Sequence, residues 1–152
     1  MSQYEQFKDH VTLLSGSSWL SSPMQSKVEG TNQFIYEIKA GINALVLDFT
    51  ISIYNETAAN QLMFVGKIFW NGEAQNISYL SMGTNNLLST GTITINGNVW
   101  TTHLKWIEPD GKTTALIDSM EIHDNELIYN TKIQLDDGKF QSLPTAIWQK
   151  VK

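Results

Sequence analysis

Short segments in which apolar and polar residues alternate occupy most of the chain from about residue 34 to residue 151. Turns rich in Asn, Asp and Gly separate these segments. Alternation with a period of two places successive side chains on opposite faces, as in a strand with one buried face and one solvent face. The pattern therefore predicts an all-β protein made of antiparallel strands.

The clearest predicted strand covers residues 44–54, where large apolar side chains share one face. These side chains are Leu45, Leu47, Phe49, Ile51 and Ile53, and the opposite face carries Asp48, Thr50 and Ser52. Further strands are predicted at residues 33–39, 62–70, 75–82, 87–95, 99–107, 112–122, 126–135 and 140–151. Asn96-Gly97 gives the strongest tight-turn signal, and Pro144 indicates an edge, a bulge or a break near the start of the last strand.

The residues before these strands predict one amphipathic helix. Ser2 and Glu5 have the spacing of a capping box, and Gly16 offers a C-terminal stop. The apolar residues at helical spacing are Tyr4, Phe7, Val11 and Leu14. We expect a helix over about residues 3–15, lying across an open end or face of the sheet because one helix cannot bury its apolar stripe alone. The Ser-rich residues 15–26 are predicted to be a connector that contains Trp19.

Together these segments predict an antiparallel up-and-down β-barrel of about eight to ten strands with one short N-terminal α-helix. Short connections favour a meander over a Greek key. No repeat or linker indicates a second domain, so residues 1–152 are predicted to form one barrel domain. The strand at 62–70 carries Met63, Val65 and Phe69 on its second face, which indicates that it is covered on both sides.

The charged residues disfavour several classes of function. The chain has 10 basic and 15 acidic side chains, scattered along its length, so no basic stripe indicates nucleic-acid binding. All the basic residues are Lys, and the absence of Arg removes the planar clamp that recognises carboxylate or phosphate groups. An apolar ligand of this chain is therefore expected to be neutral or cationic rather than fatty-acid-like.

The chain contains no Cys, which removes disulfides and thiolate chemistry and fits a reducing compartment. Tyr4, Glu5 and Phe7 stand where a secretory signal would need a basic start and an apolar run. A cytoplasmic location is therefore predicted. No segment approaches the ~20 apolar residues of a spanning helix, so no membrane span is predicted.

Three short motifs resemble a known family. The segment after the helix, Leu14-Ser15-Gly16-Ser17-Ser18-Trp19, resembles the Gly-x-Trp motif of lipocalin-like, or calycin, barrels, with the spacing Gly-x-x-Trp, one residue longer. Residues 79–91 and the closing Ala146-Ile147-Trp148-Gln149-Lys150 are similar to lipocalin-like bacterial domains of unknown function. The resemblance implies a small barrel whose interior accepts an apolar ligand. It also implies a basic residue packed over the first-strand Trp, a part that only Lys150 can take here.

Several aromatic side chains fall on the faces predicted to point inward. They are Phe49, Phe64, Trp70, Trp100, Trp106 and Tyr129. Such rings can line a ligand pocket with flat apolar walls, or they can simply fill the core, and an eight-stranded barrel has room for either arrangement.

Asp118 shares its predicted face with Thr114, Leu116, Met120 and Ile122. A carboxylate inside an apolar barrel has a raised pKa and can act as an acid, a base or a polar anchor. The alternatives are a carboxylate bonded to backbone N–H groups at a bulge, or a strand that faces the other way. Asp118 is thus both the candidate catalytic residue and a candidate ligand-binding residue.

The three His residues offer no clear metal or haem site. His103 is predicted on the solvent face, His10 on the polar side of the helix, and His123 in a turn beside Glu121 and Asp124. Three ligands from one turn rarely converge in tetrahedral geometry, so no metal and no cofactor are predicted.

Three functions remain open at this stage. The first is binding of a small, mainly apolar molecule inside the barrel, with Asp118 or Tyr129 orienting one polar group. The second is an isomerase, cyclase or lyase that uses Asp118 as general acid or base with a Tyr partner. The third is a filled barrel that acts as an interaction or assembly module. In that case residues 62–70 would be buried against a partner subunit, for example in a homo-oligomer.

Overall fold

A computed structural model describes residues 1–14, 16–21, 31–40, 46–55, 61–84 and 86–151. Within these ranges, residues 21, 31–40, 52–55 and 61–63 are described by their backbone alone.

The described residues form one helix and eleven strands. In chain order they are α1 (Gln3–Leu14), β1 (Ser17–Ser21), β2 (Thr31–Ala40), β3 (Val46–Asn55), β4 (Gln61–Asn71), β5 (Asn76–Gly83), β6 (Leu88–Asn96), β7 (Val99–Ile107), β8 (Thr113–Ile122), β9 (Glu126–Gln134), β10 (Phe140–Ser142) and β11 (Ala146–Val151).

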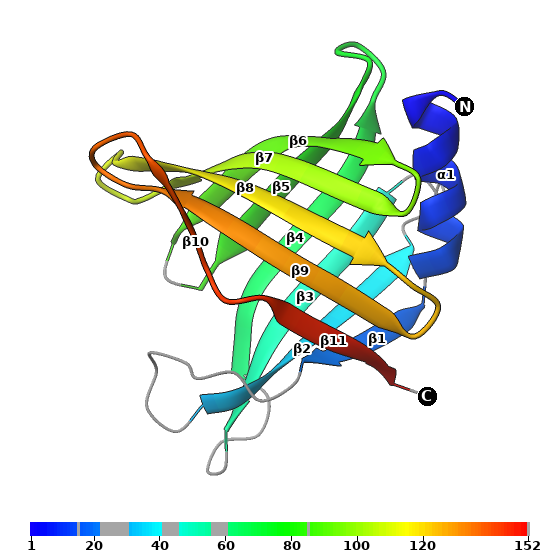
Figure 1. The fold of residues 1–152 in the computed structure, drawn as a ribbon, viewed down its shortest axis with the longest axis horizontal. Coiled ribbons are helices and arrows are strands. Elements are labelled where there is room, and N and C mark those ends of the chain that lie inside the picture. Colours follow the sequence, from blue (N-terminus) through cyan, green and yellow to red (C-terminus); the bar gives the residue numbers. More distant parts are fainter. Residues whose placement is uncertain (15, 22–30, 41–45, 56–60, 85, 152) are drawn as a thin grey trace.

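All strand pairs are antiparallel, and their order around the sheet follows the chain from β1 to β9. The sheet returns to its start because β9 pairs with β11 and β11 pairs with β1. The sheet therefore curls round on itself into an up-and-down barrel, with α1 beside one end (Figure 1). The predicted fold class is confirmed, and the pairing of β11 with both β9 and β1 covers the strand edges that an open sheet would expose there.

The last predicted strand is divided into two. Residues 143–145, which include Pro144, separate β10 from β11, and both pieces pair with β9. Proline lacks the backbone N–H that a continuous ladder requires, which accounts for the predicted break.

The predicted connector at residues 15–26 is wrong in its first part. Ser17–Ser21 form β1, which pairs with β2 on one side and β11 on the other. Trp19 is completely buried, and its indole N–H donates to the hydroxyl oxygen of Ser17 at 3.2 Å. The strand closes the barrel, so its pairing comes from distant strands and not from local β-propensity.

The hairpin between β6 and β7 is as tight as predicted, with its loop shifted by one residue. Asn96 pairs with Val99, which leaves Gly97 and Asn98 as the two-residue loop. Gly97 has a φ of +63°, a value that suits the first central position of a hairpin turn and that L side chains rarely adopt.

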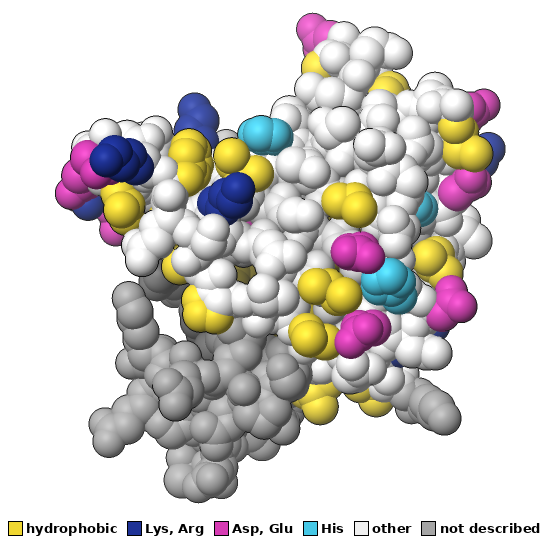
Figure 2. Space-filling view, viewed as in Figure 1, with side chains coloured by type: hydrophobic (Ala, Val, Ile, Leu, Met, Phe, Trp, Pro, Cys, Tyr) yellow, Lys and Arg dark blue, Asp and Glu magenta, His cyan; other side chains and the backbone are white. Residues whose placement is uncertain are grey.

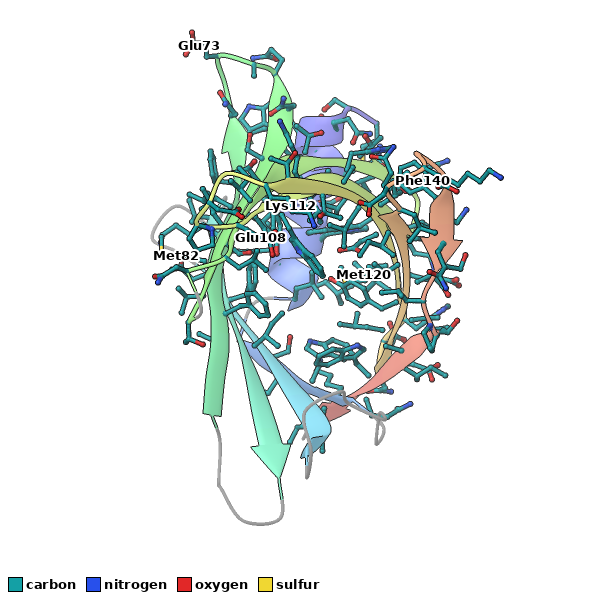
Figure 3. All side chains as sticks on the ribbon, turned by 90° about the vertical axis from the view of Figure 1, so that its left-hand side faces the viewer. Glu73, Met82, Glu108, Lys112, Met120 and Phe140 are labelled. Atoms are coloured by element: carbon teal, nitrogen blue, oxygen red, sulfur yellow. The ribbon has the colours of Figure 1, made fainter. Side chains whose placement is uncertain are left out.

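Alternation divides the described side chains of β3, β5 and β8 between the two faces as expected. Met120 of β8 points into the barrel and Met82 of β5 points away from it, as Figure 3 shows. Met120 is 4% exposed and Met82 is 54% exposed. On β3, Leu47 and Phe49 are buried while Asp48 between them is not.

The helix begins with the predicted capping box: the backbone N–H of Glu5 donates to the Ser2 hydroxyl, and the backbone N–H of Ser2 donates to the Glu5 carboxylate. Phe7, Val11 and Leu14 are buried against the barrel interior. The core that they join includes Trp19, Ile77, Ile95, Trp100 and Leu127. The helix therefore covers one end of the barrel. Because it has no helical partner among the described residues, it buries its apolar face against the barrel core.

A side-chain amide fixes the start of the helix to the sheet. Gln3 donates from Nε2 to the carbonyl oxygen of Ile95 and accepts from the Ile95 N–H at Oε1, both at 2.7 Å. The amide thus continues the ladder at the end of β6 and satisfies two backbone groups there.

Candidate functional site

Two cavities lie inside the barrel. The smaller is about 120 Å³ and the larger about 230 Å³, and both are lined by Ile51, Tyr79 and Asp118. Most of the other described lining residues are apolar or aromatic, with Ser and Thr hydroxyls among them. An apolar hollow with few polar groups is the usual character of a small-molecule site.

The structure brings most of the predicted site residues to these cavities. Phe49, Trp100 and Tyr129 line the smaller cavity, and Phe64 and Trp106 line the larger one. Asp118 borders both, so the carboxylate and five of the six predicted aromatic residues share one interior.

Trp70 is the exception among the predicted site residues. It lines neither of these two cavities and instead packs against the core at the helix end of the barrel. Its ring meets Tyr4 of α1 edge-on, with centroids 5.3 Å apart. Trp70 points inward from β4, as the alternation predicts, but its position along the barrel axis places it next to the helix and not beside the cavities.

Asp118 projects from β8 between two Thr residues on the flanking strands, Thr102 of β7 and Thr131 of β9. Oδ1 is shielded from solvent and has no hydrogen-bond partner among the described residues. Burial raises the pKa of the Asp118 carboxyl above its ordinary value, and a hydrogen bond from Thr131 partly offsets the rise. The inward orientation predicted for Asp118 is correct, since it shares its face of β8 with Leu116, Met120 and Ile122, which are all buried.

Tyr79 of β5 lines both cavities and is a candidate site residue that was not predicted from the sequence. Its hydroxyl donates to the Ser81 hydroxyl oxygen at 3.1 Å, and its ring stacks on Phe49 with centroids 5.6 Å apart. The pKa of Tyr79 is raised to about 12, mainly by burial and also by the charge of Asp118, while the hydrogen bond to Ser81 opposes the rise. The alternation Ile77-x-Tyr79-x-Ser81 carried the signal, because all three lie on the inward face of their strand.

The cavities are ordered along the barrel axis. Trp100 of the smaller cavity contacts Phe7 of α1, with ring centroids 6.0 Å apart, so this cavity lies toward the end that the helix covers. The larger cavity is lined by Trp106, six residues further along β7, and by Leu143, which is 39% exposed. The larger cavity therefore lies toward the end away from the helix, with Tyr79 and Asp118 between the two spaces.

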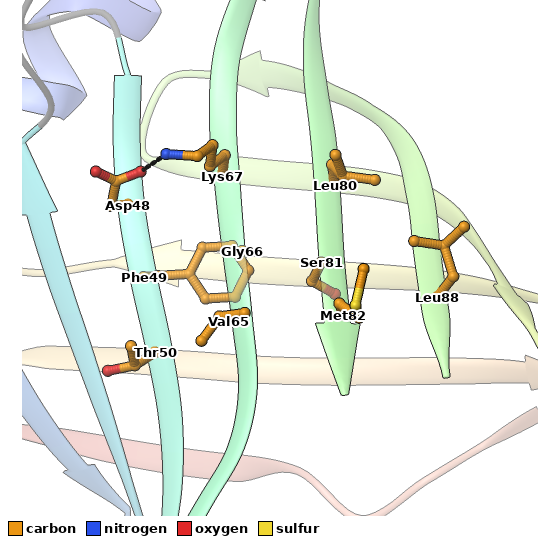
Figure 4. A pocket seen from close by; sticks show the side chains of 10 residues that line it. All are labelled: Asp48, Phe49, Thr50, Val65, Gly66, Lys67, Leu80, Ser81, Met82 and Leu88. Carbon is orange, nitrogen blue, oxygen red and sulfur yellow. Dashed lines mark hydrogen bonds and ion pairs between the residues drawn. The ribbon is translucent and has the colours of Figure 1, made fainter. Parts of the chain in front are cut away.

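A third hollow of about 420 Å³ lies on the outside of the barrel, over β3, β4, β5 and β6 (Figure 4). Its charged groups are Asp48 and Lys67, whose side chains form an ion pair at 2.5 Å. Val65, Leu80 and Met82 stand about half exposed beside it. Residues 62–70 were predicted to be covered on both sides, and Val65 shows that the outer face is open to solvent in the single chain. The interior is the better candidate site, because Oδ1 of Asp118 has no hydrogen-bond partner among the described residues, whereas Asp48 already pairs with Lys67.

The His residues are dispersed. His103 is exposed, as predicted, and His123 Nε2 lies 2.8 Å from Glu121 Oε1. His10 was predicted on the polar side of the helix, but it is half-buried and accepts a hydrogen bond from the Trp100 indole at Nδ1. Within the described ranges no three His, Asp or Glu side chains gather in a way that could hold a metal ion.

On the face in Figure 2, Lys side chains do not form a continuous basic patch, and acidic side chains lie near several of them. No helix among the described residues is both long and apolar enough to cross a bilayer.

Comparison with known proteins identifies a fold and no family. No family model matches the chain, and no curated protein matches it in sequence. Among solved structures, the crystal structure of Rv2717c from M. tuberculosis is similar, with a TM-score of 0.61 and 17% sequence identity. The match covers 96% of this chain and 98% of that one. At this identity the likeness establishes a shared barrel-like fold over nearly the whole chain.

Proposed function

We propose that the barrel binds a small, mainly apolar molecule in its interior, with Asp118 orienting one polar group of that molecule. The observation that carries the proposal is the meeting of two interior cavities at Asp118. An apolar space that surrounds one unsatisfied polar atom suits a ligand that is mostly apolar and carries one polar group.

The resemblance to lipocalin-like barrels supports the same proposal. Lys150 of β11 pairs with Trp19 of β1, and its Nζ lies 5.9 Å from the centroid of the Trp19 ring. This is the arrangement that the resemblance implied for a basic residue on the last strand. A lipocalin-like origin therefore forms part of the proposal.

The experiment is calorimetric titration with two neutral probes of different size, 2-phenylethanol and N-phenyl-1-naphthylamine. Ile51→Phe places a larger side chain where the two cavities meet, so it should abolish binding. Thr50→Phe is the matched control, because Thr50 is the neighbouring residue and lines the outer groove instead. Loss of binding in Ile51→Phe alone supports the proposal, provided that both variants keep a cooperative thermal transition. No saturable binding of either probe to the wild type would overturn it.

A second candidate function is catalysis by the Asp118 carboxyl with Tyr79 as its partner. Both groups border both cavities, and both have pKa values displaced by burial, a combination that is common at acid–base sites. Native mass spectrometry of wild type and Asp118→Asn purified from the protein's own host tests it. A different bound mass in the variant, as expected for trapped substrate, supports catalysis. The same mass in both proteins argues for binding alone.

A further inference from the structure

Asp118 is the one formally charged side chain among the described residues that line the two interior cavities. The other ionisable lining groups are the hydroxyls of Tyr79 and Tyr129. Tyr79 stays neutral at physiological pH, since its pKa is about 12. An ionised Asp118 therefore makes the electrostatic potential inside the barrel negative, which repels anions and attracts cations.

The Asp118 carboxylate has an acceptor position to fill. Thr131 donates to the carboxyl group, whereas Oδ1 is buried without a donor from any described residue. The hydroxyl of Tyr79, which lines the same cavities, donates its hydrogen bond to the Ser81 hydroxyl oxygen. A buried acceptor without a donor costs free energy, so a ligand that donates to Oδ1 gains more here than at a surface carboxylate.

The walls on both sides of Asp118 are aromatic. Trp100, Tyr79 and Tyr129 line the smaller cavity, and Trp106 and Phe64 line the larger. The faces of aromatic rings carry partial negative charge and attract ammonium groups, most strongly where the site is shielded from water. Carboxylate and rings thus favour the same kind of ligand, a cation with an apolar body.

We infer that the interior binds a small protonated amine, with its ammonium group donating to Oδ1 of Asp118 and its apolar part packed among the aromatic side chains. This inference rests on the proposed function, which it narrows to one class of ligand. The size of the cavities suits an amine with a single ring or a short alkyl chain.

The test uses three compounds with the same phenylethyl body and different end groups, an ammonium, a hydroxyl and a carboxylate: 2-phenylethylamine, 2-phenylethanol and 3-phenylpropionate. Each is titrated calorimetrically into wild type, Asp118→Asn and Asp48→Asn. Asp48→Asn is the matched control, because it removes the same charge from the outer surface of the barrel, where Asp48 pairs with Lys67.

For the wild type we expect the amine to bind about tenfold or more tightly than the alcohol, as a hydrogen bond to a charged group allows, and the carboxylate to bind least. In Asp118→Asn the amine should fall to the level of the alcohol, while Asp48→Asn should keep the wild-type ratio. Equal binding of amine and alcohol by the wild type would overturn the inference and leave the proposed function standing. Loss of the preference in Asp48→Asn alone would place the amine in the outer groove and would also overturn it. Failure of all three compounds and of the neutral probes would overturn both.

Discussion

The indole N–H of Trp100 donates a hydrogen bond to Nδ1 of His10, and the two rings lie parallel, with 4° between their planes. His10 also forms a hydrogen bond with the backbone of Gly97, at the turn between β6 and β7. One imidazole therefore joins the helix to a strand and to a hairpin loop. Nδ1 can accept this hydrogen bond only when it is unprotonated, so the arrangement requires a neutral imidazole ring.

Stability should fall at mildly acidic pH because of His10. Burial lowers the pKa of His10 below its ordinary value of 6.5. The unfolded chain then binds the proton more readily than the folded one, so the free energy of unfolding decreases as pH falls from above 6.5 through the folded pKa. His10→Asn keeps an acceptor near Nδ1 and cannot titrate, so it should flatten this part of the curve. Urea denaturation between pH 5 and pH 8, about the range in which histidine titrates, measures the effect.

His103→Asn is the control for that experiment, because His103 is exposed on the outer face of β7. It should leave the pH dependence of the wild type in place. Loss of the slope in both variants would mean that Trp100 and His10 do not cause it.

Removing the charge of Asp118 should stabilise the protein above mildly acidic pH. Burial raises the pKa of the carboxyl, so the folded state holds the proton more tightly than the unfolded one, and stability declines as pH rises from about 4 through the folded pKa. Asp118→Asn removes this penalty and should gain about 1 kcal/mol at neutral pH. Denaturation of both proteins at several pH values should show a difference that grows with pH and then levels off. A variant less stable than wild type at pH 7 would show that the carboxylate supports the fold.

The strands with clear alternation could be predicted from the sequence, and β1 could not. On β3 the described inward residues Leu47, Phe49 and Ile51 are large and apolar. On β7 the inward residues are also large and apolar, except Thr102, which pairs with Asp118. Local pattern and global burial therefore agree on these strands. Ser17–Ser21 contains three Ser residues, has low β-propensity, and becomes a strand only because β2 and β11 lie on both sides of it.

Part of the candidate site could also be predicted from the alternation of apolar and polar residues. Alternation fixes whether a side chain points inward, which was enough for Asp118. It does not fix the height of a residue along the barrel, because that height depends on the register between strands. Trp70 therefore lies under the helix and outside the cavities, and the proximity of Tyr79 to Asp118 appears only once β5 and β8 are placed in one barrel.

The contact between Lys150 and Trp19 should make a small, specific contribution to stability. An ammonium group near an indole at an exposed site contributes about 0.5–1 kcal/mol. Lys150→Gln should lose about that amount, and Lys150→Arg should keep it, because the guanidinium also stacks on aromatic rings. Lys139→Gln, in an exposed turn, is the control for loss of one positive charge. Equal stability of Lys150→Gln and wild type in urea denaturation would show that the contact contributes nothing.

Phe49 and Leu80 leave no space for a side chain at position 66 of β4, which is occupied by Gly66. It pairs with Phe49, and a Cβ added at Gly66 would lie 2.2 Å from Cζ of Phe49 and 2.9 Å from the carbonyl oxygen of Leu80. The Phe49 ring, which lines the smaller cavity, therefore occupies the space that a side chain at position 66 would take. Gly66→Ala should displace that ring and cost about 1–3 kcal/mol of stability, in the range for overpacked sites.

Gly72→Ala is the matched control, because a Cβ there meets nothing within 4 Å. If the ring is the obstacle, Phe49→Leu should cost less in the Gly66→Ala background than alone, which a double-mutant cycle measures as a favourable coupling. The rescue should be incomplete, since the carbonyl oxygen of Leu80 belongs to the backbone and moves less than a side chain. Additive effects of the two substitutions would show that Gly66 is required for its backbone alone. In that case the position of the Phe49 ring, and with it one wall of the smaller cavity, would have to be held by other contacts.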